Sequence, residues 1–304
     1  MISVVMATYN GEKFIKEQLD SICNQTMLPD EIVIQDDISK DGTLKIVREY
    51  KEKFNSIKWK IEKNLENVGY KVNFYNAICN SNGDFIFLCD QDDIWKKDKI
   101  EKMVKIMQDD ENILLLMSSF EPFYQENCKN KIHTEKYFGK KIVKFKNLNH
   151  CINTPRPGCT FCCRRNLIEK YKKLVNFKIP HDNFLWQIAS INNNAYLLNE
   201  KLILYRRHAN NASNNKVNSM NKRLQAINTQ IYELQNIIES FDLNTEQKNY
   251  FECQMKIFET RYNLVKNHDL IKYLGLLKNI KYFYNIRLVF SDIYYIIKYR
   301  GEKW

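Results

Sequence analysis

The densest group of chemically active residues in the chain is the acidic run Asp90-Gln91-Asp92-Asp93. It directly follows the apolar run 85–89, whose aromatic and branched residues are typical of a buried strand. Side chains two positions apart on an extended chain point to the same side, so Asp90 and Asp92 can share one hard divalent cation. A Mg²⁺ or Mn²⁺ ion at a strand end would neutralise a diphosphate as it leaves.

A second acidic turn, residues 35–43, follows the apolar run 32–34 and precedes a helical pattern. The apolar run 2–6 is likewise followed by polar residues and then by a helical pattern. Three strand–turn–helix units therefore lie within the first 110 residues. Because open α/β sheets bind ligands at the carboxyl ends of their strands, these units predict a nucleotide-binding half-domain with a parallel sheet.

Several short motifs follow one another in a fixed order. They are Ala7-Thr8-Tyr9-Asn10, Asp36-Asp37-x-Ser39-x-Asp41-Gly42-Thr43, Asn67-x-Gly69, Asp90-x-Asp92-Asp93-x-Trp95, Gly158-Cys159-Thr160, His181-Asp182 and Tyr205-Arg206-Arg207-His208-x-x-Asn211. Their order and spacing resemble family 2 glycosyltransferases, and the Asp-Gln-Asp-Asp-Ile-Trp stretch is similar to the rhamnosyltransferase-like branch of bacterial polysaccharide synthesis. The resemblance covers residues 1–215. It implies a GT-A, Rossmann-like α/β domain with a mostly parallel central sheet.

The resemblance also implies contacts with a nucleotide-diphosphate sugar. Thr8 and Asp36 would hold the base and ribose, although a helix-start polar residue and a helix cap are the plainer alternatives. Asp92 would bind the metal directly, helped by Asp90 and His208, while Asp93 would orient the loop. The remaining implied donor contacts are Tyr9, Asn10, Asn67, Gly69, Gln91, Arg206 and Arg207, with Asp90 also near the ribose. A basic surface turn is the alternative for residues 206–208.

Asp182 is the implied catalytic base of an inverting transfer, taking the acceptor proton as oxygen attacks the anomeric carbon. An N-cap carboxylate is the alternative, because Asp182 follows Pro180 at the start of a helical pattern. His181 would contact the acceptor or sugar, or support the site by packing. Trp95 would either stack on a sugar or seal the core. Many family members carry Arg-Asn where this chain has Val72-Asn73, so it lacks that arginine's diphosphate contact.

Two other functional classes fit parts of the pattern. A nucleotidyltransferase also uses paired acids on a doubly wound sheet, but it would normally carry a glycine-rich basic loop where this chain has residues 7–12. A non-catalytic carbohydrate-binding scaffold would not need Asp92 and Asp182 together. The sequence therefore favours an inverting, metal-dependent glycosyltransferase that acts on a dTDP-rhamnose or UDP-hexose donor and a saccharide or lipid-linked saccharide acceptor.

Composition indicates a folded protein of 304 residues whose net charge is unevenly distributed along the chain. The net charge is −4 over residues 1–110 and +15 over residues 111–304, which suggests an acidic partner such as phosphate or an anionic membrane surface. No zinc-finger or RNA-binding signature favours nucleic acid. The nine cysteines are scattered and odd in number, and no secretory signal precedes them, so we expect reduced thiols in a cytoplasmic protein.

The expected domains are a glycosyltransferase domain over 1–215, with a nucleotide-binding half (1–110) and an acceptor half (111–215), and a helical region over 216–304. Helical spacing is clear over 224–241 and 246–265, while residues 121–150 are expected to form a loop. The tail, 271–303, predicts amphipathic helices rich in lysine and tyrosine. These would rest on the inner face of the membrane, pack on the catalytic domain or form a homodimer.

Overall fold

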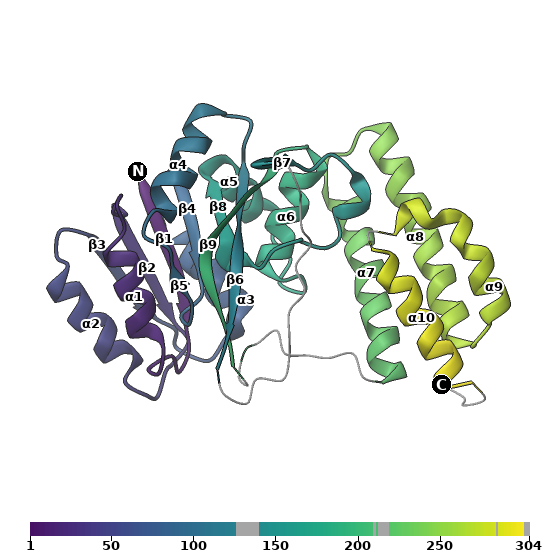
Figure 1. Ribbon diagram of the computed structural model, residues 1–304, viewed down its shortest axis with the longest axis horizontal. Helices are drawn as coiled ribbons and strands as arrows, with labels where there is room; N and C mark the ends of the chain where they lie inside the picture. The colour runs from purple at the N-terminus through teal and green to yellow at the C-terminus, as the bar shows by residue number, and fades with distance from the viewer. Residues whose placement is uncertain (126–139, 209–210, 212–218, 284, 301–304) are drawn as a thin grey trace. The chain divides into compact units, whose positions relative to one another are not determined.

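The computed structural model describes residues 1–125, 140–208, 211, 219–283 and 285–300, which belong to two compact units (Figure 1). The first unit contains residues 1–146 and 154–211, and the second contains 147–153 and 212–304. The predicted boundary at 215 lies near this division, although segment 147–153 joins the second unit. The division into halves at residue 110 stays a prediction.

The described part of the first unit is built on a nine-stranded sheet in the order β3-β2-β1-β4-β8-β6-β9-β5, with β7 beside β9. The parallel pairs are β1–β2, β2–β3, β1–β4 and β6–β9, which confirms the α/β class. The strands are β1 (Ile2–Thr8), β2 (Glu31–Asp36), β3 (Lys58–Lys63), β4 (Phe85–Cys89), β5 (Ile94–Trp95), β6 (Leu115–Tyr124), β7 (Ile142–Lys144), β8 (Phe161–Arg164) and β9 (Ala195–Arg207).

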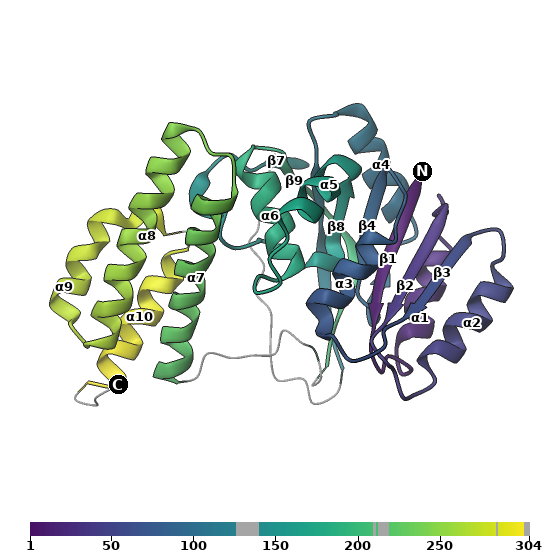
Figure 2. The same ribbon diagram turned by 180° about the vertical axis from the view of Figure 1, so that it is seen from behind.

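Helices cover both faces of this sheet, which explains why its parallel strands read as continuous apolar runs. Figures 1 and 2 show α1 and α2 on one face and α3 on the other. The core between them is formed by buried residues such as Val4, Met6, Ile32 and Phe87. The helices are α1 (Ile15–Cys23), α2 (Thr43–Lys53), α3 (Gly69–Cys79), α4 (Lys99–Asp109), α5 (Arg165–Leu174) and α6 (His181–Ile191), with the 3₁₀ turn η2 (Gly158–Thr160) before β8.

The register of the parallel strands brings the acidic turns together. Thr8 at the end of β1 lies opposite Asp36 at the end of β2, and Met6 lies opposite Cys89 at the end of β4. Asp90 follows Cys89 directly, so the turns after all three strands meet at one edge of the sheet. The chain pattern predicted this juxtaposition.

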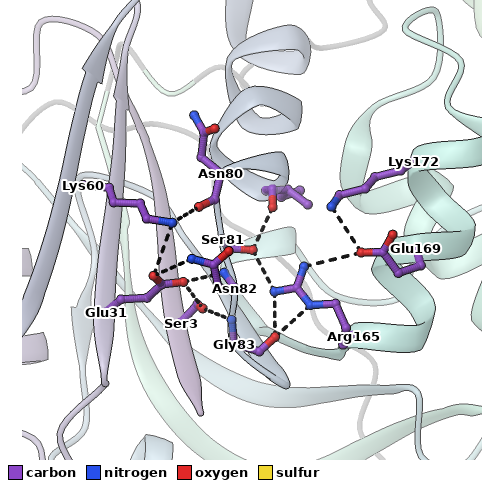
Figure 3. A network of polar contacts seen from close by, with 11 residues as sticks. Ser3, Glu31, Lys60, Asn80, Ser81, Asn82, Gly83, Arg165, Glu169 and Lys172 are labelled. Atoms are coloured by element: carbon purple, nitrogen blue, oxygen red, sulfur yellow. Dashed lines mark hydrogen bonds and ion pairs between the residues drawn. The ribbon is translucent and has the colours of Figure 1, made fainter.

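A polar network closes the opposite edge of the sheet (Figure 3). The buried Glu31 accepts hydrogen bonds from Ser3 Oγ at 2.6 Å and from Asn82 N at 2.5 Å, and Lys60 Nζ lies 3.6 Å from its Oε2. Arg165, the first residue of α5, donates to Gly83 O from Nε at 2.9 Å. The network therefore ties β1, β2, the turn before β4 and α5 to one another, away from the acidic turns.

Three segments differ from the expected pattern. The apolar runs 195–198 and 202–205 indicate two short strands, but they belong to one strand, β9, because β6 pairs along its whole length through register shifts. The expected loop over 121–150 contains the end of β6 and all of β7, while its residues 126–139 lie outside the described part of the chain. Residues 210–221, whose asparagine- and serine-rich composition predicts a linker, also lie largely outside it, and α7 begins at Met220.

The second unit is helical, as predicted for the C-terminal region. It contains η1 (Leu148–His150), α7 (Met220–Ser240), α8 (Thr245–Lys266), α9 (Leu270–Gly275), η3 (Leu276–Tyr282) and α10 (Ile286–Lys298). Asn244 and Gln247 form a reciprocal capping box that starts α8 after the short turn from α7. Among the described residues, no helix has the length and apolarity needed to cross a membrane.

A charged cluster lies inside the second unit. Asp292 of α10 has no exposed surface, and its carboxylate accepts from Arg223 Nε at 2.6 Å and Arg261 Nε at 2.6 Å. Tyr273 donates its hydroxyl to the same carboxylate at 2.5 Å. Because a buried charge is costly unless it is paired, these contacts fix how α7, α8, α9 and α10 pack together.

Candidate active site

The ends of β1 and β2 form one wall of the candidate site. Asp36 is completely buried; its Oδ2 accepts from Thr8 Oγ1 at 2.8 Å and from Ser39 Oγ at 2.6 Å, while Oδ1 accepts from Ser39 N at 2.8 Å. Thr8 and Asp36 therefore lie together, as the implied nucleotide contact requires. Direct contact of either side chain with a base stays a prediction.

Gln91 joins the turn after β1 to the acidic turn after β4. Its Oε1 accepts from Tyr9 N at 2.9 Å and its Nε2 donates to Tyr9 O at 3.0 Å. A Cβ added at Gly11 would lie 2.3 Å from Gln91 Oε1, so only glycine permits this approach. Asn10, with φ of 47°, accepts from Lys40 N at 2.9 Å. These contacts hold the turns together. They are made by three residues that were implied to contact the donor, Tyr9, Asn10 and Gln91.

Asp37 shapes the loop that leads into α3. Its carboxylate accepts from Val68 N at 2.8 Å and Gly69 N at 2.9 Å, and its carbonyl accepts from Asn67 Nδ2 at 3.3 Å. Gly69 has φ of +77°, a conformation that side chains rarely adopt. Asn67 and Gly69 are therefore brought to the candidate site as loop-forming residues, with their donor contacts untested.

The turn after β4 gathers several carboxyl groups in a buried place. Burial raises the pKa of Asp90 to about 7, and the charges of Asp92 and Asp182 act in the same direction. Burial also raises the pKa of Asp93 well above its ordinary value. Asp93 Oδ1 accepts from Arg206 N at 2.9 Å, whereas its buried Oδ2 has no hydrogen-bond partner among the described residues. Burial and mutual repulsion therefore disfavour full ionisation of these carboxyl groups unless a cation is bound.

Asp92 is positioned by the segment that follows β9. Its Oδ2 lies 2.7 Å from His208 Nε2 and accepts from Asn211 Nδ2 at 3.2 Å. Asn211 also accepts from His208 N through its Oδ1 at 2.6 Å. The sequence motif contained Asn211 but suggested no role for it. The structure places it where it orients both Asp92 and His208.

The donor groups at this edge suit a hard divalent cation. Asp90 and Asp92 supply carboxylate oxygens and His208 supplies a ring nitrogen, and a cation would relieve the repulsion between the carboxyl groups around Asp90. Among the described residues, however, the three ligand atoms found within 4.8 Å of one another come from Asp90, Asp93 and Cys159, so the implied set of Asp90, Asp92 and His208 is not gathered as tightly. Burial raises the pKa of Cys159 well above its ordinary value, so a neutral thiol stands there and suits Mg²⁺ or Mn²⁺ poorly.

Two arginines that were expected to bind the diphosphate are buried. Arg206 is 3% exposed; its Nε donates to Asp92 O at 2.6 Å and its Nη2 lies 3.0 Å from Glu17 Oε2. Its guanidinium lies between the rings of Phe14 and Phe123, 4.7 and 4.5 Å from their centroids. Arg207 is equally buried. In this structure Arg206 holds the acidic turn against α1, and the diphosphate contact of both arginines stays a prediction.

Trp95 seals the core and does not face the candidate site. It is 3% exposed, belongs to the main hydrophobic cluster and lies 5.8 Å from Phe87 between ring centroids. The buried Lys99 Nζ lies 3.9 Å from the centre of the Trp95 ring, and burial lowers the pKa of Lys99 to about 8. Of the two alternatives for Trp95, the structure supports the core role.

Asp182 lies in the first turn of α6, close enough to the acidic turn for its charge to raise the pKa of Asp90. The N-cap position is Pro180 and makes no side-chain cap, so Asp182 is not the N-cap residue. Its Oδ1 accepts from the adjacent Asn183 N at 2.8 Å. A Cβ added at Gly158 would lie 2.9 Å from Asp182 Cβ, so η2 passes very close to this side chain.

Two side chains with aromatic rings, His181 and Tyr70, lie near Asp182. His181 is buried and stacks on Phe74 with 4.0 Å between ring centroids, and burial lowers the pKa of His181. This placement favours the packing alternative for His181. Tyr70, at the start of α3, is 48% exposed. Burial of its hydroxyl raises the pKa of Tyr70, and the nearby charge of Asp182 raises it further. Sequence reasoning missed Tyr70, although an aromatic directly after Gly69 was a usable signal.

Comparisons with known proteins agree with this geometry. Residues 3–175 match the family described as Glycosyl transferase family 2. The dTDP-rhamnosyl transferase RfbG of Shigella flexneri is 32% identical over 240 residues, 75% of this chain and 80% of that protein. TarS of Staphylococcus aureus, solved in complex with UDP-GlcNAc, matches with a TM-score of 0.66 at 18% identity, covering 97% of this chain and 81% of that one.

A more distant solved structure shows the same architecture with a metal ion bound. It is a mannosyltransferase from Pyrobaculum calidifontis in complex with GDP-Man and Mn²⁺. It matches with a TM-score of 0.56 at 16% identity, covering 97% of this chain and 84% of that one. At this identity the likeness shows the fold alone.

The sheet, the acidic turns at its carboxyl edge and the structural matches define a glycosyltransferase of the GT-A fold. The family match covers more than half of the chain, and the RfbG match extends through most of it. The chain therefore belongs to glycosyltransferase family 2. The predicted resemblance to rhamnosyltransferase-like members is confirmed as a sequence similarity.

Proposed function

We propose that this enzyme transfers a sugar with inversion from a nucleotide-diphosphate donor to a saccharide or lipid-linked saccharide acceptor. The observation that carries the proposal is the position of Asp182 beside η2: a Cβ at Gly158 would lie 2.9 Å from Asp182 Cβ, and the next residue, Cys159, has its thiol within 4.8 Å of an Asp90 oxygen. An inverting displacement needs one base on the acceptor side and a group that neutralises the departing diphosphate on the other side. Asp182 and the Asp90–Asp92 turn supply these two functions on neighbouring elements.

In the proposed reaction, Asp182 takes the proton from the acceptor hydroxyl as its oxygen attacks the anomeric carbon. Thr8 and Asp36 hold the nucleoside at the ends of β1 and β2. Asp90, Asp92 and His208 are the residues that would hold Mg²⁺ or Mn²⁺. Such an ion supplies positive charge that stabilises the diphosphate leaving group.

The donor and the biological setting follow from the relatives by analogy. The similarity to a dTDP-rhamnosyl transferase favours dTDP-rhamnose, while TarS, solved with UDP-GlcNAc, favours a UDP-hexose. A role in surface polysaccharide synthesis on the cytoplasmic side of the membrane is the setting that these relatives suggest. Nucleic acid has no place in the proposed reaction.

A donor assay tests the proposal. Purified protein is incubated with dTDP-rhamnose and with UDP-hexoses in the presence of Mn²⁺, and the released nucleotide is identified. The proposal predicts nucleoside diphosphate and free or transferred sugar. With pyrophosphate added, formation of nucleoside triphosphate and sugar 1-phosphate would indicate a nucleotidyltransferase, and no turnover with any donor and acceptor would indicate a non-catalytic scaffold.

A thermal-shift panel separates binding from turnover. Because a ligand that binds only the folded state raises its stability by mass action, the true donor's nucleotide should raise the melting temperature of the protein. Nucleoside diphosphates of the wrong base serve as matched controls. If no nucleotide changes the melting temperature, the proposed donor site is wrong.

A further inference from the structure

The outer face of α10 carries a stripe of exposed apolar side chains. Phe290 and Ile297 are 66% and 56% exposed, and Ile286 and Tyr294 are also exposed. At about 100° per residue, these four positions fall on one side of the helix. Val289, Asp292, Tyr295 and Ile296 are buried on the other side. We call the four exposed residues Ile286, Phe290, Tyr294 and Ile297 the α10 stripe.

Basic residues border the α10 stripe on both sides. Arg287 and Lys298 are exposed along one border by helical position, and Arg300 follows on the other. Lys298 Nζ also lies 5.5 Å from the centre of the Tyr294 ring. The acid of this helix, Asp292, is fully buried and paired with Arg223 and Arg261, so α10 presents no carboxylate to the surface.

The sequence around α10 is also predominantly basic. Residues 270–300 contain six lysine and arginine residues and one acid, Asp292. Exposed apolar side chains bordered by cations are the pattern of a helix that lies in a membrane interface, where tyrosine rings and lysine stems reach both the acyl chains and the headgroups. The charge selects an anionic surface.

A second copy of the chain fits this face less well. A symmetric dimer places a patch against itself, so Arg287, Lys298 and Arg300 would be brought together with their own equivalents. Like charges brought together at an interface are unfavourable, and interface cores are depleted in lysine. An anionic lipid surface instead complements every exposed charge on α10.

We propose that the α10 stripe docks this enzyme on an anionic lipid bilayer, with Phe290, Tyr294 and Ile297 entering the interface and Arg287 and Lys298 contacting lipid phosphates. The functional benefit of this docking rests on the proposed lipid-linked acceptor, because the enzyme and its acceptor would then lie at the same membrane surface. The docking itself requires no catalysis.

Flotation on vesicles tests the proposal. We expect the full-length protein to float with vesicles of phosphatidylcholine and phosphatidylglycerol at low salt, and to be released at about 0.5 M salt because the Debye length shortens. It should not float with phosphatidylcholine alone. If the protein does not float with the anionic vesicles at low salt, the proposal is wrong.

Paired variants assign the binding to the α10 stripe. Arg287→Glu with Lys298→Glu should lower the partition coefficient by more than about tenfold, since each basic residue contributes roughly fivefold. Phe290→Ser with Ile297→Ser should also lower it at low salt, where the wild type floats, although this variant keeps every basic residue of α10. The matched controls are Lys248→Glu with Lys256→Glu on α8, and the exposed Leu28→Ser, which should float as the wild type does.

Two further measurements separate the other outcomes. Sedimentation without lipid should show a monomer; a dimer that the stripe variants dissociate, without flotation, would assign the face to a second copy and overturn the proposal. Flotation that survives both stripe variants would also overturn it, by assigning binding to another surface. Donor hydrolysis should be unchanged in the stripe variants. A failed flotation test would therefore leave the proposed function intact, and a failed donor assay would leave the proposed membrane docking intact.

Discussion

Asp92 meets His208 and Asn211 at a single carboxylate oxygen, and this contact sets the first prediction. Asp92→Asn keeps the size but removes the charge, so we expect turnover to fall on the order of 10²-fold with the fold intact. Asn211→Ala removes one hydrogen bond from each of Asp92 and His208 and should weaken Mn²⁺ activation roughly tenfold or more. The measurement is a Mn²⁺ titration of donor hydrolysis for each variant.

A double variant checks that these residues act as one unit. Since Asn211 works through Asp92, Asn211→Ala should cost little more in the Asp92→Asn background. Additive losses would mean that Asn211 contributes independently. Full activity of Asp92→Asn in the presence of EDTA would contradict a metal-dependent mechanism.

At this scale the sequence placed the acidic residues at strand ends, but it did not indicate that Arg206 and Arg207 are buried. Asp90 and Asp92 follow one strand directly, so their position depends only on local chain direction. The burial of Arg206 depends on Phe14, Phe123 and Glu17, which come from distant segments that no local pattern connects. Trp95 was left between two roles for the same reason, because only the pairing of β5 with β9 buries it.

At the scale of elements, the close approach of η2 to α6 positions Asp182. In Gly158→Ala the new Cβ would lie 2.9 Å from Asp182 Cβ, so one of the two elements must shift. We expect transfer to an acceptor to fall about tenfold or more, because catalysis is sensitive to ångström displacements. Nucleotide binding, measured by thermal shift, should be retained because Thr8 and Asp36 lie on other elements.

A matched glycine gives the control for this variant. Gly275→Ala, in the second unit, meets no atom within 4 Å and should leave transfer unchanged. If Gly158→Ala transfers sugar as fast as the wild type does, Asp182 does not depend on η2 for its position.

The polar network at the other edge of the sheet predicts a pH-dependent stability. Burial acts to raise the pKa of Glu31, but hydrogen bonds from Ser3 and Asn82 and the charge of Lys60 outweigh it and hold the pKa below its ordinary value. The stabilisation is therefore present above the unfolded pKa and is lost as the pH falls through the folded pKa. Glu31→Gln should cost about 1–3 kcal/mol in the free energy of unfolding at neutral pH.

Urea unfolding at several pH values measures this effect. The difference between wild type and Glu31→Gln should shrink as the pH is lowered below the ordinary glutamate range. Glu62→Gln, at an exposed position of β3, is the control and should differ little from the wild type at any pH. A difference that stays constant or grows on acidification would exclude the charge of Glu31 as its cause.

The elements themselves were predicted where apolar spacing is strong. The strands of β1, β2 and β4 and the long helices of the second unit follow from residue patterns. The residue pattern does not predict β3, because only two apolar residues, Trp59 and Ile61, carry its alternation. The two apolar runs of β9 indicate separate strands because Asn199 and Glu200 lie between them. Pairing with β2 and β6 makes these segments strands, which a single sequence does not show.

At the scale of the whole molecule, the second unit is held by its own charged cluster. Asp292→Ala would leave Arg223 and Arg261 buried without their shared carboxylate, which costs about 3–5 kcal/mol. We expect the helical signal of this unit to unfold at lower denaturant. The thermal shift caused by nucleotide should persist, because every proposed nucleotide contact lies in the first unit.

Asp292→Asn supplies the graded control, since it keeps the shape but loses the charge and should fall between alanine and wild type. If Asp292→Ala unfolds at the same denaturant concentration as the wild type, the buried cluster does not hold the four helices together.

The central claim is that Asp182 is the base of a glycosyl transfer from a nucleotide sugar. The direct measurement is the rate of sugar transfer by the wild type and by Asp182→Asn, with nucleotide binding followed on the same samples. The amide keeps the size but cannot take a proton, so transfer should fall roughly 10²–10⁴-fold while nucleotide binding and folding stay normal. Transfer by Asp182→Asn at the wild-type rate would contradict the account, because the base would then lie elsewhere.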